Sequence, residues 1–303
     1  MGFEKFKETI LEKVSKKAEG MFHALIKNVT KNNGIKLTGI MAEAEGCNCA
    51  PCLYLDDYYR LYVNKEMKLS EAADEIYRQL KGHLQDAEGI NISGFTEWGT
   101  VKGSIYAKLI NAEKNKGLLE KTPHRMFLDM AAVYYVVISG LAAEGTGTIL
   151  IRNDHMEMWG QDEGDLYEAA ISNMRSDGEP CFNSMAAFIR GIMPEAAGFF
   201  GDRKQPFDVG MYVLTNHRKC FGASEILDKD TLHSIAGKIG DGFIVLPSSV
   251  HEVIILPPQK EKEYGELANM VKEVNATQVS MEEQLSDHVY VYSKREGSLK
   301  IAV

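Results

Sequence analysis

Ser248, Ser249, His251 and Glu252 are the side chains in this sequence that most resemble catalytic machinery. A hydroxyl, an imidazole and a carboxylate can act as nucleophile, base and orienting group in hydrolysis. On extended backbone Ser249 and His251 point to the same side, since side chains alternate along a strand. One hypothesis is therefore a hydrolase-like enzyme that uses His251 with Ser249 or Glu252.

The same segment has a simpler interpretation. There is no Gly-x-Ser-x-Gly motif around these serines, and a His-Glu-x-x-His zinc helix is excluded because residue 255 is Ile255. The alternative is a polar turn in which Ser249 caps the backbone and the His251 ring hydrogen-bonds to it. We favour the polar turn and keep the hydrolase hypothesis open.

A second polar cluster, Asn153-Asp154-His155-Met156-Glu157, follows a predicted strand. Together with His124, Arg125 and Asp129 it could form an acid/base or metal pocket, although each group is commonplace by itself. Asn153 and His155 are therefore candidate binding residues. Asn216, directly after a predicted strand, is another.

The cysteines Cys47, Cys49 and Cys52 form a three-thiol cluster. Structural zinc needs four ligands, usually in two separated pairs, so a metal here would take its fourth ligand from Cys181, Cys220 or a histidine. We favour the alternative of incidental loop thiols and predict no metal at this site. The chain has neither a phosphate-binding Gly-x-x-x-x-Gly-Lys-Ser/Thr loop nor a Gly-x-Gly-x-x-Gly turn opening a helix. We expect no cofactor.

Tyrosines recur at positions 54, 58, 59 and 62. Tyrosine is favoured in protein interfaces, so Tyr54 and Tyr58 are candidate binding residues. The alternative is half-buried packing, which is the more frequent fate of such a stripe.

The clearest elements position the Ser-His-Glu segment. Two apolar β-branched runs flank it within Gly242–Pro258, and they predict a hairpin of buried strands. The other elements expected in the last hundred residues are a strand at 211–215, a helix at 230–239 capped by Asp230, a helix at 261–274 burying Tyr264, Leu267, Val271 and Val274, and a final hairpin of 289–293 with 299–303. Short links between strands favour antiparallel pairing.

The N-terminal residues predict a small layer of helices and strands. We expect a helix at 3–17, a hairpin of 22–30 with 35–44 turned at Asn33-Gly34, a strand running into helix at 53–63, and a helix at 71–80 capped by Ser70. A polar, glycine-bearing stretch at 83–94 is the predicted boundary. The domains are then 1–82, an α-β-β-β-α module, and 95–303.

Between these two parts we predict strands at 105–110, 126–138 and 146–152, a short helix within 111–119, a helix at 162–175 and another starting at Pro180. The stretch 126–138 could also be a buried helix, but its Val and Tyr residues favour a strand. A loose connection follows at 195–210. The predicted fold class is α+β, mainly antiparallel sheets with helices packed on one side, as a small N-terminal module plus a larger C-terminal module.

Composition narrows the functional classes. Hydrophobic residues make up 45% and charged residues 25%, as in ordinary globular proteins, and the formal net charge of −9 disfavours a broad basic nucleic-acid surface. No uncharged run reaches the about 20 residues that span a bilayer. We expect no membrane, no nucleic acid and a cytoplasmic location, with the five cysteines reduced.

Nine short motifs together resemble an uncharacterised family of bacterial proteins. They are Lys31-Asn32-Asn33-Gly34, Pro51-x-Leu53-Tyr54-Leu55, Lys108-Leu109-Ile110-Asn111, Pro123-His124-Arg125-x-Phe127-Leu128-Asp129, Met211-Tyr212-Val213-Leu214-Thr215-Asn216, Gly222-Ala223-Ser224, Leu246-Pro247-Ser248-Ser249-x-His251-Glu252, Met270-Val271-x-Glu273-Val274-Asn275 and Leu285-Ser286-Asp287-x-Val289-Tyr290. The family is known only as a domain of unknown function, and its members resemble cargo of mobile elements in Gram-positive gut anaerobes. The resemblance spans nearly the whole chain and implies no activity. Cysteines at 47, 49 and 52 are not part of its pattern.

The leading functional hypothesis is a non-enzymatic binding or accessory protein of a mobile genetic element. It rests on the missing catalytic and cofactor motifs, the acidic composition and the family resemblance. We expect a protein partner, and an inhibitor of a host defence system is one protein of this class.

Overall fold

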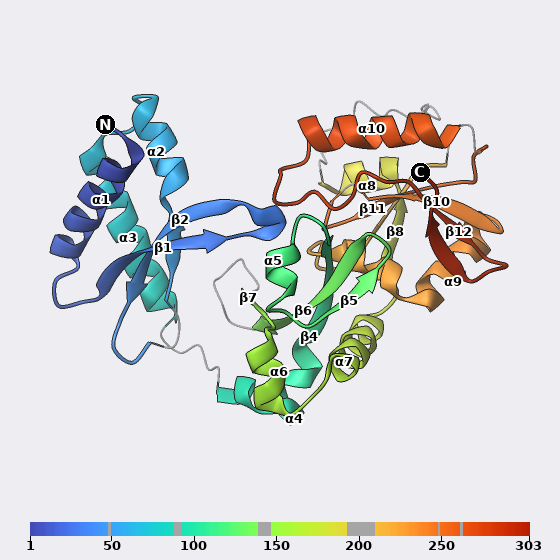
Figure 1. Cartoon of the computed structure of the whole chain (residues 1–303), viewed down its shortest axis with the longest axis horizontal. Helices are drawn as coiled ribbons and strands as arrows, with labels where there is room; N and C mark the ends of the chain where they lie inside the picture. The colour runs from blue at the N-terminus through green and yellow to red at the C-terminus, as the bar shows by residue number, and fades with distance from the viewer. Residues whose placement is uncertain (48–49, 88–92, 139–146, 193–209, 248, 261–262) are drawn as a thin grey trace. The chain divides into compact units, whose positions relative to one another are not determined.

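The computed structural model (Figure 1) describes residues 1–47, 50–87, 93–138, 147–192, 210–247, 249–260 and 263–303. The chain divides into two compact units. Unit 1 comprises residues 1–95 and 138–148, and unit 2 comprises 96–137 and 149–303. Sheets of three, six and four strands and their helices make the protein an α+β fold.

Unit 1 is a three-stranded antiparallel sheet with helices packed on it. Its elements are α1 (Phe3–Lys17), β1 (His23–Thr30), η1 (Asn32–Gly34), β2 (Lys36–Glu43), β3 (Cys52–Tyr54), α2 (Leu55–Val63) and α3 (Leu69–Ala87), followed by η2 (Ser93–Thr96) near the boundary. Phe6, Ile10 and Val14 are fully buried on one face of α1, which confirms the predicted helix. The β1–β2 hairpin is also confirmed, and it turns where Asn33 has a φ of 59°.

The predicted bounds of α3 are wrong at both ends. The helix begins at Leu69, so Ser70 lies inside it, and the Lys68 amide donates to the Glu71 carboxylate at 2.9 Å. At the other end the helix continues to Ala87, because buried Leu84 follows buried Leu80 at helical spacing. Part of the predicted boundary, residues 88–92, lies outside the described residues.

The larger sheet of unit 2 has six strands in the order β13-β12-β10-β11-β9-β8. Its strands are β8 (Cys181–Ser184), β9 (Tyr212–Thr215), β10 (Gly242–Leu246), β11 (Val253–Leu256), β12 (Tyr290–Ser293) and β13 (Ser298–Ile301). The predicted hairpin at 242–258 is confirmed as the central antiparallel pair β10–β11, and β12–β13 confirms the final hairpin.

Helices cover both faces of this sheet. α10 (Tyr264–Thr277) packs on Ile244 and Leu246, which point to one side of β10. The alternate residues Phe243 and Val245 are buried on the other side, where α9 (Lys229–Ile239) contacts the sheet (Figure 1). The expectation that helices lie on one side is wrong for this sheet. A strand that is apolar at every position is buried on both faces.

The smaller sheet of unit 2 has the order β4-β6-β5, and β7 pairs with β6. Its elements are α4 (Trp98–Val101), η3 (Lys102–Ser104), β4 (Ile105–Asn111), α5 (Lys116–Leu119), β5 (His124–Phe127), β6 (Met130–Ile138), β7 (Gly147–Leu150), α6 (Asn153–Trp159) and α7 (Glu163–Ser176). The single strand predicted at 126–138 is in fact two strands. Phe127 pairs with Met130 across a two-residue turn in which Leu128 has a φ of 59°.

Three other predicted details are corrected. Residues after Pro180 form edge strand β8 before α8 (Met185–Ile192) begins. Asp228, following η6 (Gly222–Leu227), caps α9 through the Asp230 amide at 3.1 Å, so Asp230 itself is not the cap. Val274 on α10 is 37% exposed, whereas Ala268 and Val271 are buried.

Candidate functional site

Ser249, His251 and Glu252 form a tight turn between β10 and β11. The Ser249 hydroxyl donates to Glu252 Oε1 at 2.7 Å and accepts the His251 amide at 3.0 Å. The Ser249 amide donates to the Glu252 carbonyl at 3.3 Å. The hydroxyl is therefore engaged within its own turn, and Ser249 is only 5% exposed. Ser248 lies outside the described residues.

The His251 ring is held by a neighbouring loop. Its Nδ1 accepts the backbone N–H of Phe221 at 3.1 Å, and the Phe221 ring stacks on it with centroids 5.5 Å apart. Because Nδ1 is the acceptor, the neutral ring carries its proton on Nε2, which lies 3.6 Å from Glu283 Oε1. In this arrangement neutral His251 has no free lone pair to act as a base on Ser249.

A groove opens beside this turn. It has a volume of about 620 Å³ and is lined in part by His251, Glu252 and Glu283. Its apolar lining comes from α8, the sheet and the end of α10, namely Met185, Phe188, Val213, Ile254, Val274 and Val279. Apolar walls with a few polar groups at the rim are typical of a binding site.

The loop after β9 positions Phe221. The Asn216 side chain accepts the Cys220 amide at 3.2 Å and donates to the Cys220 carbonyl at 2.8 Å, which closes the loop. Lys219 and Phe221 have φ values of 50° and 57°, an uncommon conformation for residues other than glycine. Asn216 therefore supports the ring that stacks on His251.

Gly222 allows this loop to approach the Ser-His-Glu turn. A Cβ placed there would lie 2.2 Å from Thr215 Oγ1 and 2.7 Å from the His251 carbonyl oxygen. The Thr215 hydroxyl itself donates to that carbonyl at 2.8 Å. Only a glycine fits between the two segments.

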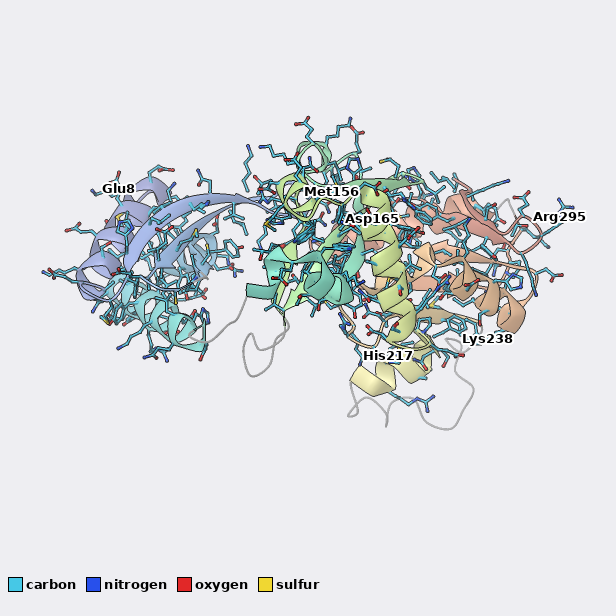
Figure 2. All side chains as sticks on the ribbon, turned by 90° about the horizontal axis from the view of Figure 1, so that it is seen from below. Glu8, Met156, Asp165, His217, Lys238 and Arg295 are labelled. Carbon is cyan, nitrogen blue, oxygen red and sulfur yellow. The ribbon has the colours of Figure 1, made fainter. Side chains whose placement is uncertain are left out.

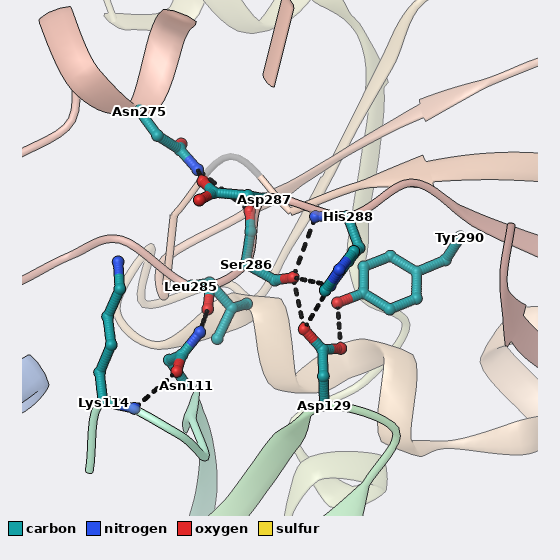
Figure 3. Close-up of polar contacts among 9 residues, drawn as sticks. All are labelled: Asn111, Lys114, Asp129, Asn275, Leu285, Ser286, Asp287, His288 and Tyr290. Atoms are coloured by element: carbon teal, nitrogen blue, oxygen red, sulfur yellow. Dashed lines mark hydrogen bonds and ion pairs between the residues drawn. The ribbon is translucent and has the colours of Figure 1, made fainter. Parts of the chain in front are cut away.

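Asp129 is the centre of a second polar cluster in unit 2 (Figure 3). Its carboxylate accepts the Tyr290 hydroxyl at 2.5 Å, the Ser286 hydroxyl at 2.7 Å and His288 Nδ1 at 2.9 Å. Burial by itself would raise the pKa of Asp129, but these three hydrogen bonds outweigh it and leave the pKa below its usual value. Burial, with the hydrogen bond to Asp129, raises the pKa of Tyr290.

His288 and Ser286 do not form a nucleophile relay with Asp129. Both the serine hydroxyl and the carboxylate face the same ring nitrogen, Nδ1, at 3.4 Å and 2.9 Å. A relay needs the two groups on opposite nitrogens. The cluster instead joins the β5–β6 turn of the smaller sheet to β12 of the larger sheet. Asp129 and Tyr290, which it connects, are 161 residues apart in the sequence.

The model of a family of unknown function (DUF5688) matches residues 3–294. The chain belongs to this family. Neither a curated protein nor a solved structure matches it. Membership in DUF5688 therefore establishes kinship over nearly the whole chain and leaves activity to be argued from the site.

The other candidate residues of this DUF5688 protein are held by separate partners. The Asn153 amide donates to the Glu120 carbonyl at 3.3 Å, and His155 Nδ1 accepts the Arg152 amide at 3.3 Å. Burial lowers the pKa of His155.

The residues proposed to join them have different partners. Arg125 makes a two-pronged ion pair with Glu163 and stacks on Tyr167, while His124 Nδ1 contacts the Thr122 carbonyl at 2.9 Å. Arg125 and Asp129 are thus each bonded to groups outside the predicted set.

The tyrosine stripe belongs largely to the core of unit 1. Tyr58, Tyr59 and Tyr62 pack against that core, and Tyr59 and Tyr62 contact the buried ring of Phe6. The Tyr58 hydroxyl donates to Gln79 at 3.1 Å. Tyr54 lies under the Lys31 ammonium, 4.6 Å from its ring centroid.

The thiols that the structure describes are unpaired. Cys47, Cys52, Cys181 and Cys220 are free, and Cys49 lies outside the described residues. Among the described residues no group of three His, Cys, Asp or Glu side chains is arranged to hold a metal ion. Cys181 Sγ lies 3.5 Å from Nδ1 of His217 (Figure 2).

Two features of this family member were missed from the sequence. The partnership of Asp129 with His288 joins remote segments, although both the Phe127-Leu128-Asp129 and the Leu285-Ser286-Asp287 motifs were visible. Phe221 precedes the Gly222-Ala223-Ser224 motif, which was the available signal for a special backbone position.

Within the described part of the chain, every helix is too short or too polar to cross a bilayer.

Proposed function

We propose that the protein is a non-enzymatic binding protein and that the groove beside His251 receives a segment of a partner protein. The observation that carries the proposal is the composition of that groove, with apolar walls next to two carboxylates. Interfaces bury apolar side chains in a central patch and place polar groups around it. Val274 near the end of α10 is an apolar side chain that is 37% exposed and that a bound partner segment would bury.

The charges of the groove define the chemistry of the segment. Glu252 and Glu283 present acceptors, His251 presents an Nε2 donor, and Lys219 is the cation among the lining residues. A partner segment with apolar side chains and one or more basic residues complements this lining. The formal net charge of −9 favours encounter with a basic partner.

The bonding of His251 supports binding more than catalysis. Its Nδ1 is occupied by the Phe221 amide, and the Ser249 hydroxyl is occupied by Glu252. A ring locked by backbone makes a rigid wall, and rigid walls reduce the entropy lost on association.

In the proposed function the protein meets its partner in the cytoplasm, as an accessory protein of a mobile genetic element. An inhibitor of a host defence system is one protein of this class.

The test is co-purification from the native host after cross-linking, with wild type and two variants on one helix. Val274→Glu puts a charge into the groove. Met270→Glu is the matched control, because Met270 is 52% exposed on the same helix but does not line the groove. We expect wild type and Met270→Glu to retain the same partner and Val274→Glu to lose about tenfold or more of it.

Equal partner recovery from Val274→Glu, with both variants folded by circular dichroism, would contradict the groove as the binding site. A wild-type chain that recovers no specific partner would contradict the binding function itself.

A hydrolase-like enzyme remains the second candidate. The specific observation in its favour is that His251 lines a concave groove beside Glu283, a carboxylate from elsewhere in the chain. Catalysis by Ser249 would need the Phe221 loop to release Nδ1. Turnover of ester or peptide substrates that disappears in His251→Ala and persists in Val274→Glu would favour this candidate.

A further inference from the structure

A second cavity lies in unit 2, away from the His251 turn. It has a volume of about 310 Å³ and opens between the end of α7, edge strand β8 and α9. Its apolar walls include Met174, Phe182 and Ile235. This volume is at the small end of ligand-binding pockets, which range over about 300–1,000 Å³.

Glu225 is one of the residues that line this cavity. The residue is 6% exposed, and its side chain makes no hydrogen bond or ion pair with any of the residues that the structure describes. Buried polar groups are almost always paired, so a buried carboxyl that makes no bond with the described residues needs an explanation. A cationic ligand in the cavity would give it a partner.

The arginine that lines the cavity has other partners. Arg175 donates to both oxygens of Asp228, at 3.0 Å and 2.6 Å, and lies 2.6 Å from Asp230. Asp228 is itself buried, with a side chain 7% exposed. Arg175 therefore neutralises Asp228 and Asp230, and none of the described residues forms an ion pair with Glu225.

The charged groups around Glu225 come from every element that surrounds the cavity. They are Arg175 and Asp177 at the end of α7, Glu179 before β8, Asp228 after η6, and Asp230 and Lys238 on α9. Asp177 is paired with Arg218 at 2.7 Å. Carboxylates outnumber cations in this set, so the cavity favours a positively charged occupant.

Burial raises the pKa of Glu225 to about 7, and the neighbouring charges of Asp228 and Asp177 add to the rise. A strongly perturbed titratable group in a cavity is a frequent mark of a functional site. Burial and the acidic neighbours both make the charged form of this carboxyl unfavourable in the free protein.

We propose that this cavity binds a small aliphatic amine, with its ammonium group against the Glu225 carboxylate and its carbon chain against Met174, Phe182 and Ile235. A second ammonium at the far end of a diamine would meet the exposed carboxylates of Glu179 and Asp230 at the mouth, which are 91% and 78% exposed. Lys238 projects from α9 at the surface (Figure 2), and its side chain is 54% exposed, so it can move aside. The site is separate from the groove proposed for the protein partner.

Binding should depend on pH in a defined direction. An ammonium group, with a pKa of about 10.4, stays charged near neutrality, whereas Glu225 must lose its proton to pair with it. Affinity should therefore rise with pH up to about 7 and level off above it. A neutral ligand that accepts a hydrogen bond from protonated Glu225 would show the opposite dependence.

Calorimetry on the full chain tests the proposal with diaminobutane as the probe and butanediol as its uncharged match. We expect diaminobutane to bind about tenfold more tightly near pH 7.5 than near pH 6, and butanediol to give no heat. Glu225→Gln should abolish the binding. Glu273→Gln, a change at an exposed residue of α10, should leave it unchanged.

A second measurement needs only the wild-type chain. Titrations near pH 7 in two buffers of different ionisation heat report the protons released, and we expect release of about half of one proton per site, because Glu225 is about half protonated there. Absence of diaminobutane binding at pH 8, binding that survives Glu225→Gln, or butanediol binding that strengthens at low pH would each overturn the proposal.

Discussion

Half-buried Asp129 and buried Glu225 are two carboxyl groups of the same unit with opposite surroundings. Asp129 accepts hydrogen bonds from Tyr290, Ser286 and His288. Glu225 accepts none from the described residues and has Asp228 and Asp177 as like-charged neighbours. The pKa of Asp129 is accordingly lowered, while burial and those neighbours raise the pKa of Glu225 to about 7.

The difference shows that partners, more than burial, decide what a carboxyl group does. Both groups lose hydration in the folded state, which by itself opposes ionisation. For Asp129 the three hydrogen-bond donors more than compensate for the lost hydration of the charged form, so its charge stabilises the contact between two sheets. Without donors the Glu225 charge remains a cost, which a ligand can remove.

Asp129→Asn should give the largest effect. It removes the charge that three donors serve, and we expect a loss of roughly 3 kcal/mol in the free energy of unfolding at neutral pH. Because the folded pKa is lowered, the contribution of Asp129 is present above the unfolded value and is lost as the pH falls through the folded one. Urea unfolding at pH 7 and in acid should show the gap shrinking below about pH 4.

Asp154→Asn is the control for this measurement, because Asp154 is 76% exposed in the same unit. If the two variants unfold at the same urea concentration, Asp129 does not stabilise the sheets in the way argued above.

Glu225→Gln should have the next largest effect and the opposite sign. The folded carboxyl holds its proton up to about pH 7, whereas the unfolded one ionises near 4.5, so wild-type stability falls as the pH rises through this window. Gln removes that penalty. Since its amide is still buried without a partner, we expect a net gain on the order of 2 kcal/mol at pH 8 and a smaller one at pH 5.

Thermal unfolding of Glu225→Gln and Glu179→Gln at both pH values checks this expectation, with Glu179 91% exposed at the mouth of the same cavity. A Glu225→Gln protein less stable than wild type at pH 8 would mean that the carboxylate has a stabilising partner.

Tyr290→Phe should give the smallest effect of the three, a loss of about 1 kcal/mol. It removes one donor, but Ser286 and His288 still serve Asp129, and the phenyl ring remains buried. A double-mutant cycle with Asp129→Asn should be strongly non-additive, because both changes act on one hydrogen-bond cluster. Additive losses would mean that the Tyr290 hydroxyl contributes through another contact.

Much of the fold could be predicted because its signals are local. Apolar residues at helical spacing marked α1, and the Asn33-Gly34 turn marked the first hairpin. The errors have local causes as well. Leu128 adopts a positive φ that leucine rarely takes, so the break between β5 and β6 was invisible. Asp228 and Asp230 are equally good caps, and only the geometry chooses Asp228.

The candidate site was predictable only in part. The Ser-His-Glu segment was found as a polar turn between two buried strands, and its turn bonds are local. The ring of His251 is oriented by Phe221, 30 residues earlier, and the groove walls come from three separate elements. No spacing rule relates those residues, so neither the orientation of the ring nor the groove could be read in advance.

The amino-acid sequence by itself determined the α+β class, the central β10–β11 hairpin and the polar character of its turn, because periodicity and turn chemistry act over a few residues. Tertiary structure alone decided that Asp129 meets His288 and that His251 Nδ1 accepts a backbone N–H. It also decided that Glu225 is buried where none of the described residues bonds to its side chain. Hydrogen bonding and desolvation depend on which remote groups share a space, and packing settles that only when the whole unit has folded.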